Sequence, residues 1–366
     1  MIRSSRWQAL SVAVGVAALC LAPVTNAERL FWNSETADAD QSPAGCRADC
    51  AIGKQSMVTL SGVDTTKTGR WVVRDSRGRY VAVSDDFRQL LIFEGTGKLL
   101  ASPRPSVGRI VSLFVDSAGA VHAYDSKAGS LLAFDSSYRV TTRTTLPHPP
   151  ALSLGEGRFL VEGQIDKPGM VGHPLHVMSK DGSIARSFGA DAGPFRPTDT
   201  LKNSRAVCLN PDGTIWSIAS GGRLLERWDT STGRRLAQVT VKSTWFRESS
   251  TAFNGLAANP FVVAIWAEGD LVWILYKAPD PKWIPRRIPE SEWLKATARA
   301  RAEIDDRRSD WVLEAVRSDT GSVVALRRFD RQLLRQEGSV AITSDVASAN
   351  PSGGLELWTP TLVKKK

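Results

Sequence analysis

The four histidines of this 366-residue chain are the residues best suited to acid–base or metal chemistry near neutral pH. His122 stands in an alternating apolar run, which indicates a hydrogen-bonded structural role in a strand. His173 and His176 would bind one metal ion together if the chain turned between them. Pro174 disfavours a helical turn there, and residues three apart on a strand point to opposite faces. We therefore expect structural roles, with a shared metal site as the alternative.

Other reactive patterns are missing from the sequence. There is no Gly-x-Ser-x-Gly elbow, no glycine-rich phosphate loop and no dinucleotide-binding fingerprint. Asp85 and Asp86 are adjacent and would point apart on a strand, while Asp305 and Asp306 are expected in solvent on a helix. Neither pair is suited to shared acid–base work. Catalytic residues are therefore not predicted, and whether the protein is an enzyme stays open.

Two of the cysteines lie close together in the sequence, and an exported chain would meet an oxidising compartment in which disulfides persist. Cys46 and Cys50 lie four apart in a segment of small and polar residues, and this spacing predicts a local disulfide. A metal site is the alternative, but no second Cys or His pair lies nearby. Cys208 stands in an apolar strand-like run and is expected to be a buried thiol, although removal of Cys20 with the predicted signal peptide would leave an odd number of cysteines and so leaves its pairing open.

The N-terminus predicts export. Residues 1–27 combine two arginines, a short apolar run and a small-residue site before Glu28, which is typical of a cleaved signal peptide. A membrane anchor is the alternative; after cleavage we expect no transmembrane anchor and a periplasmic or secreted protein. Residues 28–55 read as an arm or linker and 364–366 as a basic tail. The net charge of +9 is spread along the chain, so a nucleic-acid partner is not expected.

The body of the chain repeats one pattern of strand, tight turn and strand. Residues 72–73 precede the turn Asp75-Ser76-Arg77-Gly78 and a strand at 80–83, and related phrases recur at about 40 to 50 residues. Glycine supplies positive φ in these turns, and Asp or Asn caps them with its side chain. Units of this kind predict an all-β propeller.

Six units fit residues 56–363, with 57–60 available to complete the last one. The Asp-x-x-Gly turns and the Phe-Asp or Trp-Asp that closes the third strand resemble six-bladed propellers of the broad NHL and TolB-like group. This resemblance implies a six-bladed fold and does not specify an activity. A pair of β-sandwiches is the structural alternative, and residues 56–73 would allow a seventh blade.

One insertion interrupts the fifth unit. Residues 279–310 fall between its second and third strands and contain a helical pattern from about 290 to 306. Connections alternate between the two faces of a propeller, so this insertion should share a face with the link at 245–248. Aromatic and Arg side chains often carry binding energy, so the candidate binding residues are Trp245, Phe246, Arg247, Trp283, Arg286, Arg287 and Trp293. The alternative is a helix that packs on its own blade.

The sequence therefore predicts a non-catalytic module that binds a protein, a peptide or an envelope component through the face with the insertion, and no cofactor. The alternative is a metal-dependent hydrolase or lyase. Asn254 and Gly255 are similar to the metal-binding entry of lactonase-type propellers, which hold a divalent cation in the central channel. The Glu and Asp that would complete that site are not recognisable, so Asn254 is the sole candidate ligand.

Overall fold

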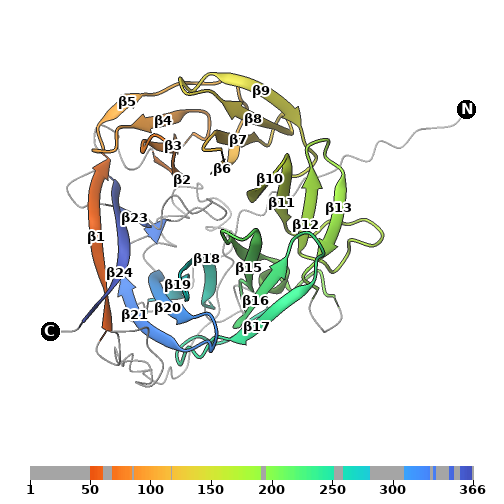
Figure 1. Ribbon diagram of the computed structural model, residues 1–366, viewed down its shortest axis with the longest axis vertical. Coiled ribbons are helices and arrows are strands. Elements are labelled where there is room, and N and C mark those ends of the chain that lie inside the picture. The colour runs from red at the N-terminus through yellow and green to blue at the C-terminus, as the bar shows by residue number, and fades with distance from the viewer. Residues whose placement is uncertain are drawn as a thin grey trace, which may run out of the picture.

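The chain forms an all-β propeller, as predicted. The computed structural model describes residues 50–60, 68–84, 86–116, 118–190, 195–250, 259–280, 309–329, 333–334, 346–349 and 355–364. The described strands form six four-stranded antiparallel sheets that are arranged in a ring (Figure 1). Five of these sheets are blades of four consecutive strands, and the remaining closing sheet combines both ends of the described chain.

The first blade contains β2 (Thr68–Arg74), β3 (Tyr80–Ser84), β4 (Leu90–Phe93) and β5 (Leu99–Ala101). The second contains β6 (Ile110–Val115), β7 (Val121–Asp125), β8 (Ser130–Phe134) and β9 (Val140–Thr145). The third contains β10 (Leu152–Gly155), β11 (Arg158–Glu162), β12 (Leu175–Ser179) and β13 (Ile184–Phe188). A short helix, α1 (Thr200–Asn203), precedes the fourth blade.

The fourth blade contains β14 (Arg205–Leu209), β15 (Thr214–Ala219), β16 (Leu224–Asp229) and β17 (Arg235–Thr240). The fifth contains β18 (Phe261–Glu268), β19 (Leu271–Pro279), β20 (Ser309–Arg317) and β21 (Val323–Phe329). The closing sheet contains β22 (Leu333–Leu334), β23 (Val346–Ala349), β24 (Leu355–Lys364) and β1 (Cys50–Leu60).

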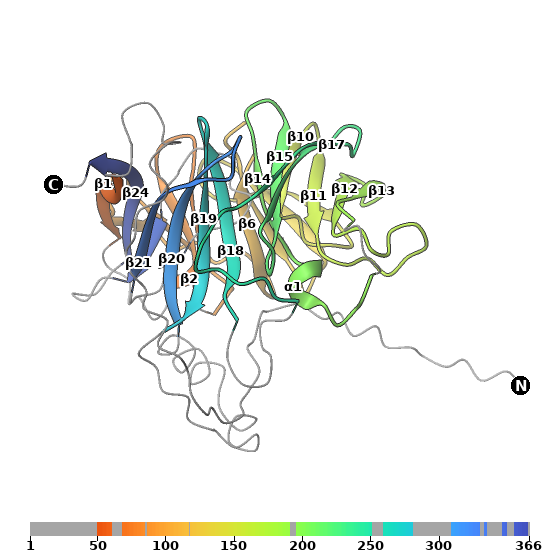
Figure 2. The same cartoon turned by 90° about the horizontal axis from the view of Figure 1, so that it is seen from below.

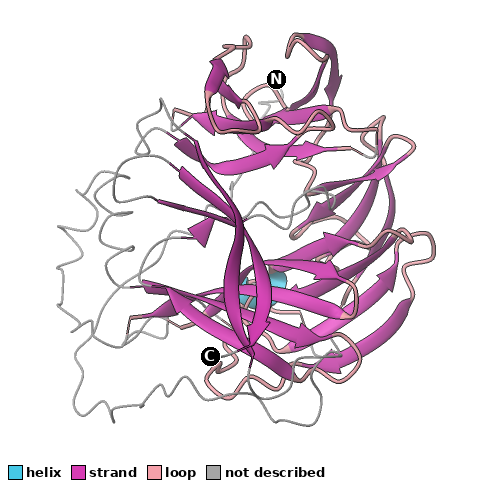
Figure 3. Cartoon of the chain, turned by 60° about the vertical axis from the view of Figure 1, so that its left-hand side comes forward, coloured by secondary structure: helices cyan, strands magenta, loops and turns pink. Residues whose placement is uncertain are grey.

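The closing sheet joins the two ends of the described chain. β1 pairs antiparallel with β24, from Cys50 opposite Lys364 to Leu60 opposite Leu355, and Figure 3 shows these long strands in front. The prediction that 57–60 completes the last unit is confirmed. The boundary of the predicted arm is corrected: β1 begins at Cys50, because its backbone pairs with β24, so the arm cannot extend to residue 55. Lys364 likewise belongs to β24 and not to the tail.

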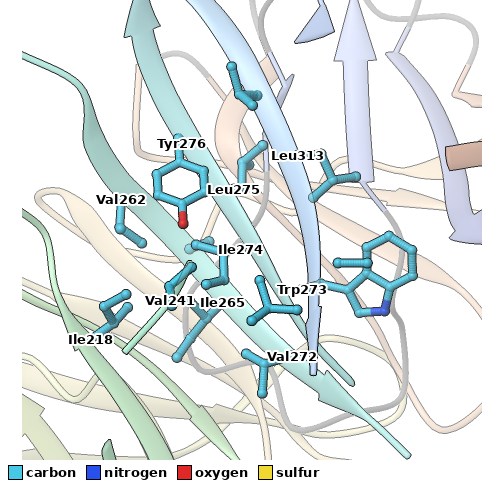
Figure 4. Packing of buried hydrophobic residues seen from close by; sticks show 14 of the residues in the cluster. Ile218, Val241, Val262, Ile265, Val272, Trp273, Ile274, Leu275, Tyr276 and Leu313 are labelled. Atoms are coloured by element: carbon cyan, nitrogen blue, oxygen red, sulfur yellow. The ribbon is translucent and has the colours of Figure 1, made fainter. Parts of the chain in front are cut away.

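Hydrophobic clusters lie between neighbouring sheets around the ring. One joins the closing sheet to the first blade through Leu60, Leu357 and Phe93, and others join the first to the second blade, the second to the third and the third to the fourth. The largest surrounds the fifth blade (Figure 4). It also contains Ile52 of β1. Burial of apolar surface between sheets therefore stabilises the ring.

The predicted Asp-x-x-Gly turns join first and second strands. In the first blade, the Gly78 amide donates to the Asp75 carbonyl oxygen at 3.0 Å, with φ of +77° at the glycine. The Asp75 carboxylate accepts from the amides of Arg77 and Arg79. The turn that begins at Asp116 repeats these contacts. The turn residues were thus predicted for the correct physical reason.

The connections lie on two opposite faces of the ring because each sheet is antiparallel. One face carries the turns between first and second and between third and fourth strands. The other carries the second-to-third connections, the links between blades and α1 (Figure 2). β19 ends and β20 begins on this second face, which we call the insertion face because residues 281–308 lie between these two strands in the sequence. The predicted helix at 290–306 lies outside the described residues.

Candidate functional site

The candidate binding residues divide between described and undescribed parts of the chain. Trp245, Phe246 and Arg247 lie in the link from β17 to β18 on the insertion face. The side chain of Phe246 is buried, that of Trp245 is half-buried and that of Arg247 is exposed. Outside the described residues lie Trp283, Arg286, Arg287, Trp293, Asn254 and Cys46. Of the three described residues, Arg247 is the one most accessible to a partner.

Trp245 and Phe246 pack on Tyr276 of β19. The ring centroids of Trp245 and Tyr276 are 5.1 Å apart, and those of Phe246 and Tyr276 are also 5.1 Å apart. Trp245 and Phe246 contact each other edge to face at 5.8 Å. Rings at these separations touch, so they leave no room for a ligand between them. The two aromatic residues therefore fix the link onto the fifth blade.

Glu314 of β20 lies beneath this link and is fully buried. One carboxylate oxygen, Oε1, accepts hydrogen bonds from Ser243 Oγ and from Trp245 Nε1, each at 2.7 Å. The other oxygen, Oε2, has no hydrogen-bond partner among the described residues. Burial raises the pKa of the Glu314 carboxyl, and the hydrogen bonds from Ser243 and Trp245 offset only part of this rise.

Arg223 directly precedes β16 in the fourth blade and is hydrogen-bonded to the same link. Its guanidinium donates to the carbonyl oxygens of Val241 and Ser243 at 3.1 and 2.8 Å. Its positive charge also lowers the pKa of Glu314 in part. The link is thus attached to the fourth blade through Arg223 and to the fifth through Glu314. These contacts hold the backbone of the link that carries Arg247 in one position.

The two ends of the insertion are joined by Arg328 of β21. Its guanidinium donates to the carboxylate of Asp310 in β20 and, at 2.6 Å, to the carbonyl oxygen of Pro279 in β19. The Nζ atom of Lys277 in β19 lies 5.8 Å from the ring centroid of Trp311 in β20. The stem of the insertion therefore has a fixed geometry.

A second buried polar cluster joins the third and fourth blades. Glu162 accepts from Ser204 Oγ at 2.9 Å and from the Arg205 amide at 2.7 Å. The Arg205 guanidinium donates to Glu226 at 2.9 Å and to the Gly189 carbonyl oxygen at 3.0 Å. These contacts join the third blade to the fourth through a network of hydrogen bonds.

Sequence reasoning did not find Glu314, Ser243 or Arg223. One signal was present: Glu314 is the only carboxylate in the run from Trp311 to Val316, where every other residue is apolar. A charged residue inside a buried strand pattern indicates a paired or perturbed group. Its partners lie about 70 residues earlier in the chain, at 243 and 245, and no local pattern connects them.

Two described cysteines and two described histidines are buried or bonded to other residues of the protein. Cys50 is disulfide-bonded, and its predicted pairing with Cys46 stays a prediction. Cys208 is a buried thiol. His122 is hydrogen-bonded to Asp116 at 2.9 Å, which confirms its predicted role. His176 contacts Ser187 Oγ and the Gly163 carbonyl oxygen with its two ring nitrogens.

The described residues form a fixed stem and link on the insertion face. Among them, no three His, Cys, Asp or Glu side chains are placed to hold a metal ion. Glu314 has the perturbed pKa that functional carboxyls often have, yet its described neighbours are an indole, a phenol and a hydroxyl that serve the link. The arrangement can present Arg247 and the stem of the insertion to a partner.

Comparison with known proteins agrees with the fold. No known family model matches the chain, and no curated protein matches it. It is similar to a DUF4221 family member from Bacteroides vulgatus, with a TM-score of 0.57 and 10% identity over 86% of this chain and 99% of that chain. It is also similar to a putative exported protein from Bacteroides fragilis, with a TM-score of 0.54 and 9% identity over 86% of this chain and 96% of that chain.

A third solved structure is more distant. Virginiamycin B lyase from Staphylococcus aureus has a TM-score of 0.42 and 14% identity over 84% of this chain and 99% of that chain. All of these identities are below the range in which function can be inferred. The comparisons therefore show that the chain has a β-propeller fold.

Proposed function

We propose that this protein is an exported, non-catalytic propeller that binds a protein, a peptide or an envelope component through its insertion face. The observation that carries this proposal is the stem formed by Pro279 at the end of β19 and Asp310 in β20, which Arg328 holds together where the insertion leaves and rejoins the blade. Elaborated loops on rigid scaffolds commonly carry binding functions. The neighbouring link, with exposed Arg247, extends the same surface.

Export is supported by one structural neighbour, which is described as a putative exported protein. As a separate finding, the described ranges contain no helix long and apolar enough to cross a membrane. Mass measurement of the mature protein tests export: cleavage after Ala27 should leave Glu28 as the first residue. A cell-associated chain that retains residues 1–27 would contradict it.

The relation to the NHL and TolB-like group is also a proposal. It is supported by the four-stranded sheets of the ring and by the Asp-x-x-Gly turns between first and second strands. The family relation does not choose a partner, because one fold serves many functions.

The binding proposal is tested by removing the insertion without disturbing its stem. Residues 281–308 would be replaced by a short Gly-Ser linker, which keeps Pro279, Asp310 and Arg328 in place. Chemical crosslinking to a purified envelope fraction, with quantitative mass spectrometry, would compare this variant with the full chain. We expect envelope components that crosslink to the full chain at low salt and are lost from the variant.

Charge reversal on each face supplies the matched control. Arg247→Glu alters the insertion face, whereas Arg234→Glu alters an exposed residue in the third-to-fourth turn of the fourth blade on the opposite face. Binding should weaken in Arg247→Glu and persist in Arg234→Glu. An identical set of crosslinked components in the full chain and the folded deletion variant would refute the proposal.

A further inference from the structure

A compact loop on the insertion face connects β11 to β12 in the third blade and spans residues 163–174. Its two ends meet where the Gly163 amide donates to the Pro174 carbonyl oxygen at 2.9 Å. Gly163 has a φ of +113°, a conformation that residues with a side chain rarely adopt. Turn hydrogen bonds within the loop join Met170 to Lys167 and His173 to Met170. The closed loop is thus defined by a few main-chain bonds.

His176 joins this loop to the blade. Its Nε2 lies 3.0 Å from the Gly163 carbonyl oxygen, and its Nδ1 lies 2.7 Å from Ser187 Oγ on β13. Because a carbonyl oxygen only accepts, Nε2 must donate, and Nδ1 then accepts from the Ser187 hydroxyl in the neutral ring. The imidazole is fully buried. One neutral side chain therefore connects β13 to the first residue of the loop.

The basic groups that face this imidazole come from several elements. Two of them are His148, in the link before β10, and His173, at the end of the loop; their side-chain charges lower the pKa of His176, whereas the backbone of His173 raises it. Burial and the charge of Lys167 in the loop lower the pKa of His148. His173 Nδ1 is buried without a hydrogen-bond partner among the described residues.

The other charged groups near His176 do not neutralise it. Glu162 of β11 accepts hydrogen bonds from Ser204 Oγ and from the amide of Arg205, where the fourth blade begins. Arg186 of β13 donates to the Thr230 carbonyl oxygen. Arg158 pairs with Glu156 across the turn at the other end of β11, and Asp166 is exposed on the loop. None of these described carboxylates forms an ion pair with His176.

We propose that residues 163–174 form an acid-sensitive strap on the insertion face, which opens when His176 accepts a proton and water enters to solvate the charged ring. The strap is a property of the third blade and does not depend on the proposed partner. It would make the shape of the insertion face differ between neutral and acidic surroundings.

The expected size of the effect follows from proton linkage. Burial lowers the pKa of His176 to about 4 in the closed loop, whereas a solvated histidine titrates near ~6.5. The open form binds the proton more tightly, so acid favours opening. From these two values, the equilibrium constant for opening should rise about 20-fold between pH 7 and pH 5.

Hydrogen exchange of the full chain measures this opening. Protection factors, corrected for the intrinsic pH dependence of exchange, would be determined at pH 7 and pH 5. We expect protection of the Gly163, Met170 and His173 amides to fall about 20-fold at pH 5. Amides of β15 and β16 supply an internal control, because the fourth blade contains no histidine. A loop whose protection is the same at both pH values would overturn the proposal.

Two variants separate His176 from the other histidines. His176→Gln keeps a donor for the Gly163 carbonyl but cannot be protonated, so its loop protection should not change with pH. His122→Gln, on the opposite face beside Asp116, should behave like the wild type. Retention of the full pH response in His176→Gln would be contrary to the proposal. If His176→Gln does not fold, NMR titration of the wild type decides: a His176 ring that gains its proton with no change in the loop amides would also overturn it.

Discussion

At the scale of single residues, Glu314 shows how a buried carboxyl can fix a loop by accepting its hydrogen bonds. It accepts hydrogen bonds from Ser243 and Trp245 and is fully buried, and no cation among the described residues forms an ion pair with it. Burial costs the charged form of a carboxyl more than the neutral form. The folded state therefore binds the Glu314 proton more tightly than the unfolded chain does, while the carboxyl holds the link above it through hydrogen bonds from Ser243 and Trp245.

This arrangement predicts the pH dependence of stability at Glu314. The pKa of Glu314 is raised in the folded state, so the folded chain holds this proton more tightly than the unfolded chain. The contribution to stability is fully present below the unfolded value of ~4.5 and is lost as the pH rises through the folded value. We expect Glu314→Gln to flatten the fall in unfolding free energy above this pH, measured by urea titration at several pH values.

Glu314→Leu is the comparison variant. It leaves Ser243 Oγ and Trp245 Nε1 without their acceptor, and we expect it to lower the unfolding free energy by about 2 to 4 kcal/mol. Equal pH profiles for the wild type and Glu314→Gln would show that Glu314 does not titrate differently in the two states.

At the scale of elements, the third-to-fourth turns hold neighbouring sheets close together. Gly321, in the turn between β20 and β21, has a φ of +72°, and a Cβ atom there would lie 2.0 Å from the Thr240 carbonyl oxygen of β17. Gly97 makes the same approach to Thr59 of β1. At these turns, glycine is required by the neighbouring sheet as well as by the local backbone.

A pair of glycine substitutions separates the two requirements. Gly213 has a φ of +81°, but a Cβ atom there would have no neighbour within 4 Å, so Gly213→Ala should lose only about 1 to 2 kcal/mol through the left-handed backbone. Gly321→Ala meets main-chain atoms of β17 and should lose at least about 3 kcal/mol. Equal losses in urea unfolding would show that the fifth blade can move away from the fourth without penalty.

Elements also show what the sequence could predict. The turns beginning at Asp75 and Asp116 were found because glycine and aspartate have local conformational roles. β10 and the outer strand β9 were not identified: β10 is short, and β9 is exposed on both faces, so neither has an alternating pattern. The site was harder to predict, because Glu314 obtains its partners from a link far away in the sequence.

At the scale of the whole molecule, β1 connects two interfaces of the ring. Ile52 packs in the cluster around the fifth blade, and its carbonyl oxygen accepts from Arg327 of β21 at 2.8 Å. Leu60, at the other end of the strand, packs between the closing sheet and the first blade. The N-terminal strand therefore contributes to closure on both sides.

Truncation of these two side chains tests the role of β1. Ile52→Ala and Leu60→Ala should each lower the unfolding free energy by about 2 to 4 kcal/mol, because both side chains are buried. Their effects should add within about 0.5 kcal/mol, since the clusters are separate. Val363→Ala, on the exposed side of β24, is the control and should lose less than about 0.5 kcal/mol. Small effects of both truncations in urea unfolding would mean that β1 is dispensable for closure.

A measurement on the whole molecule decides between a binding module and a channel enzyme. A lactonase-type centre needs several oxygen ligands that converge on one cation. Among the described residues no three His, Cys, Asp or Glu side chains are placed to hold a metal ion, and Asn254 lies outside them. We expect elemental analysis of protein purified without chelator to find no stoichiometric divalent metal, and EDTA to leave the melting temperature unchanged. One equivalent of bound calcium or zinc, lost in Asn254→Ala together with an EDTA-sensitive melting temperature, would favour the enzyme, because a ligand that binds only the folded state must stabilise it.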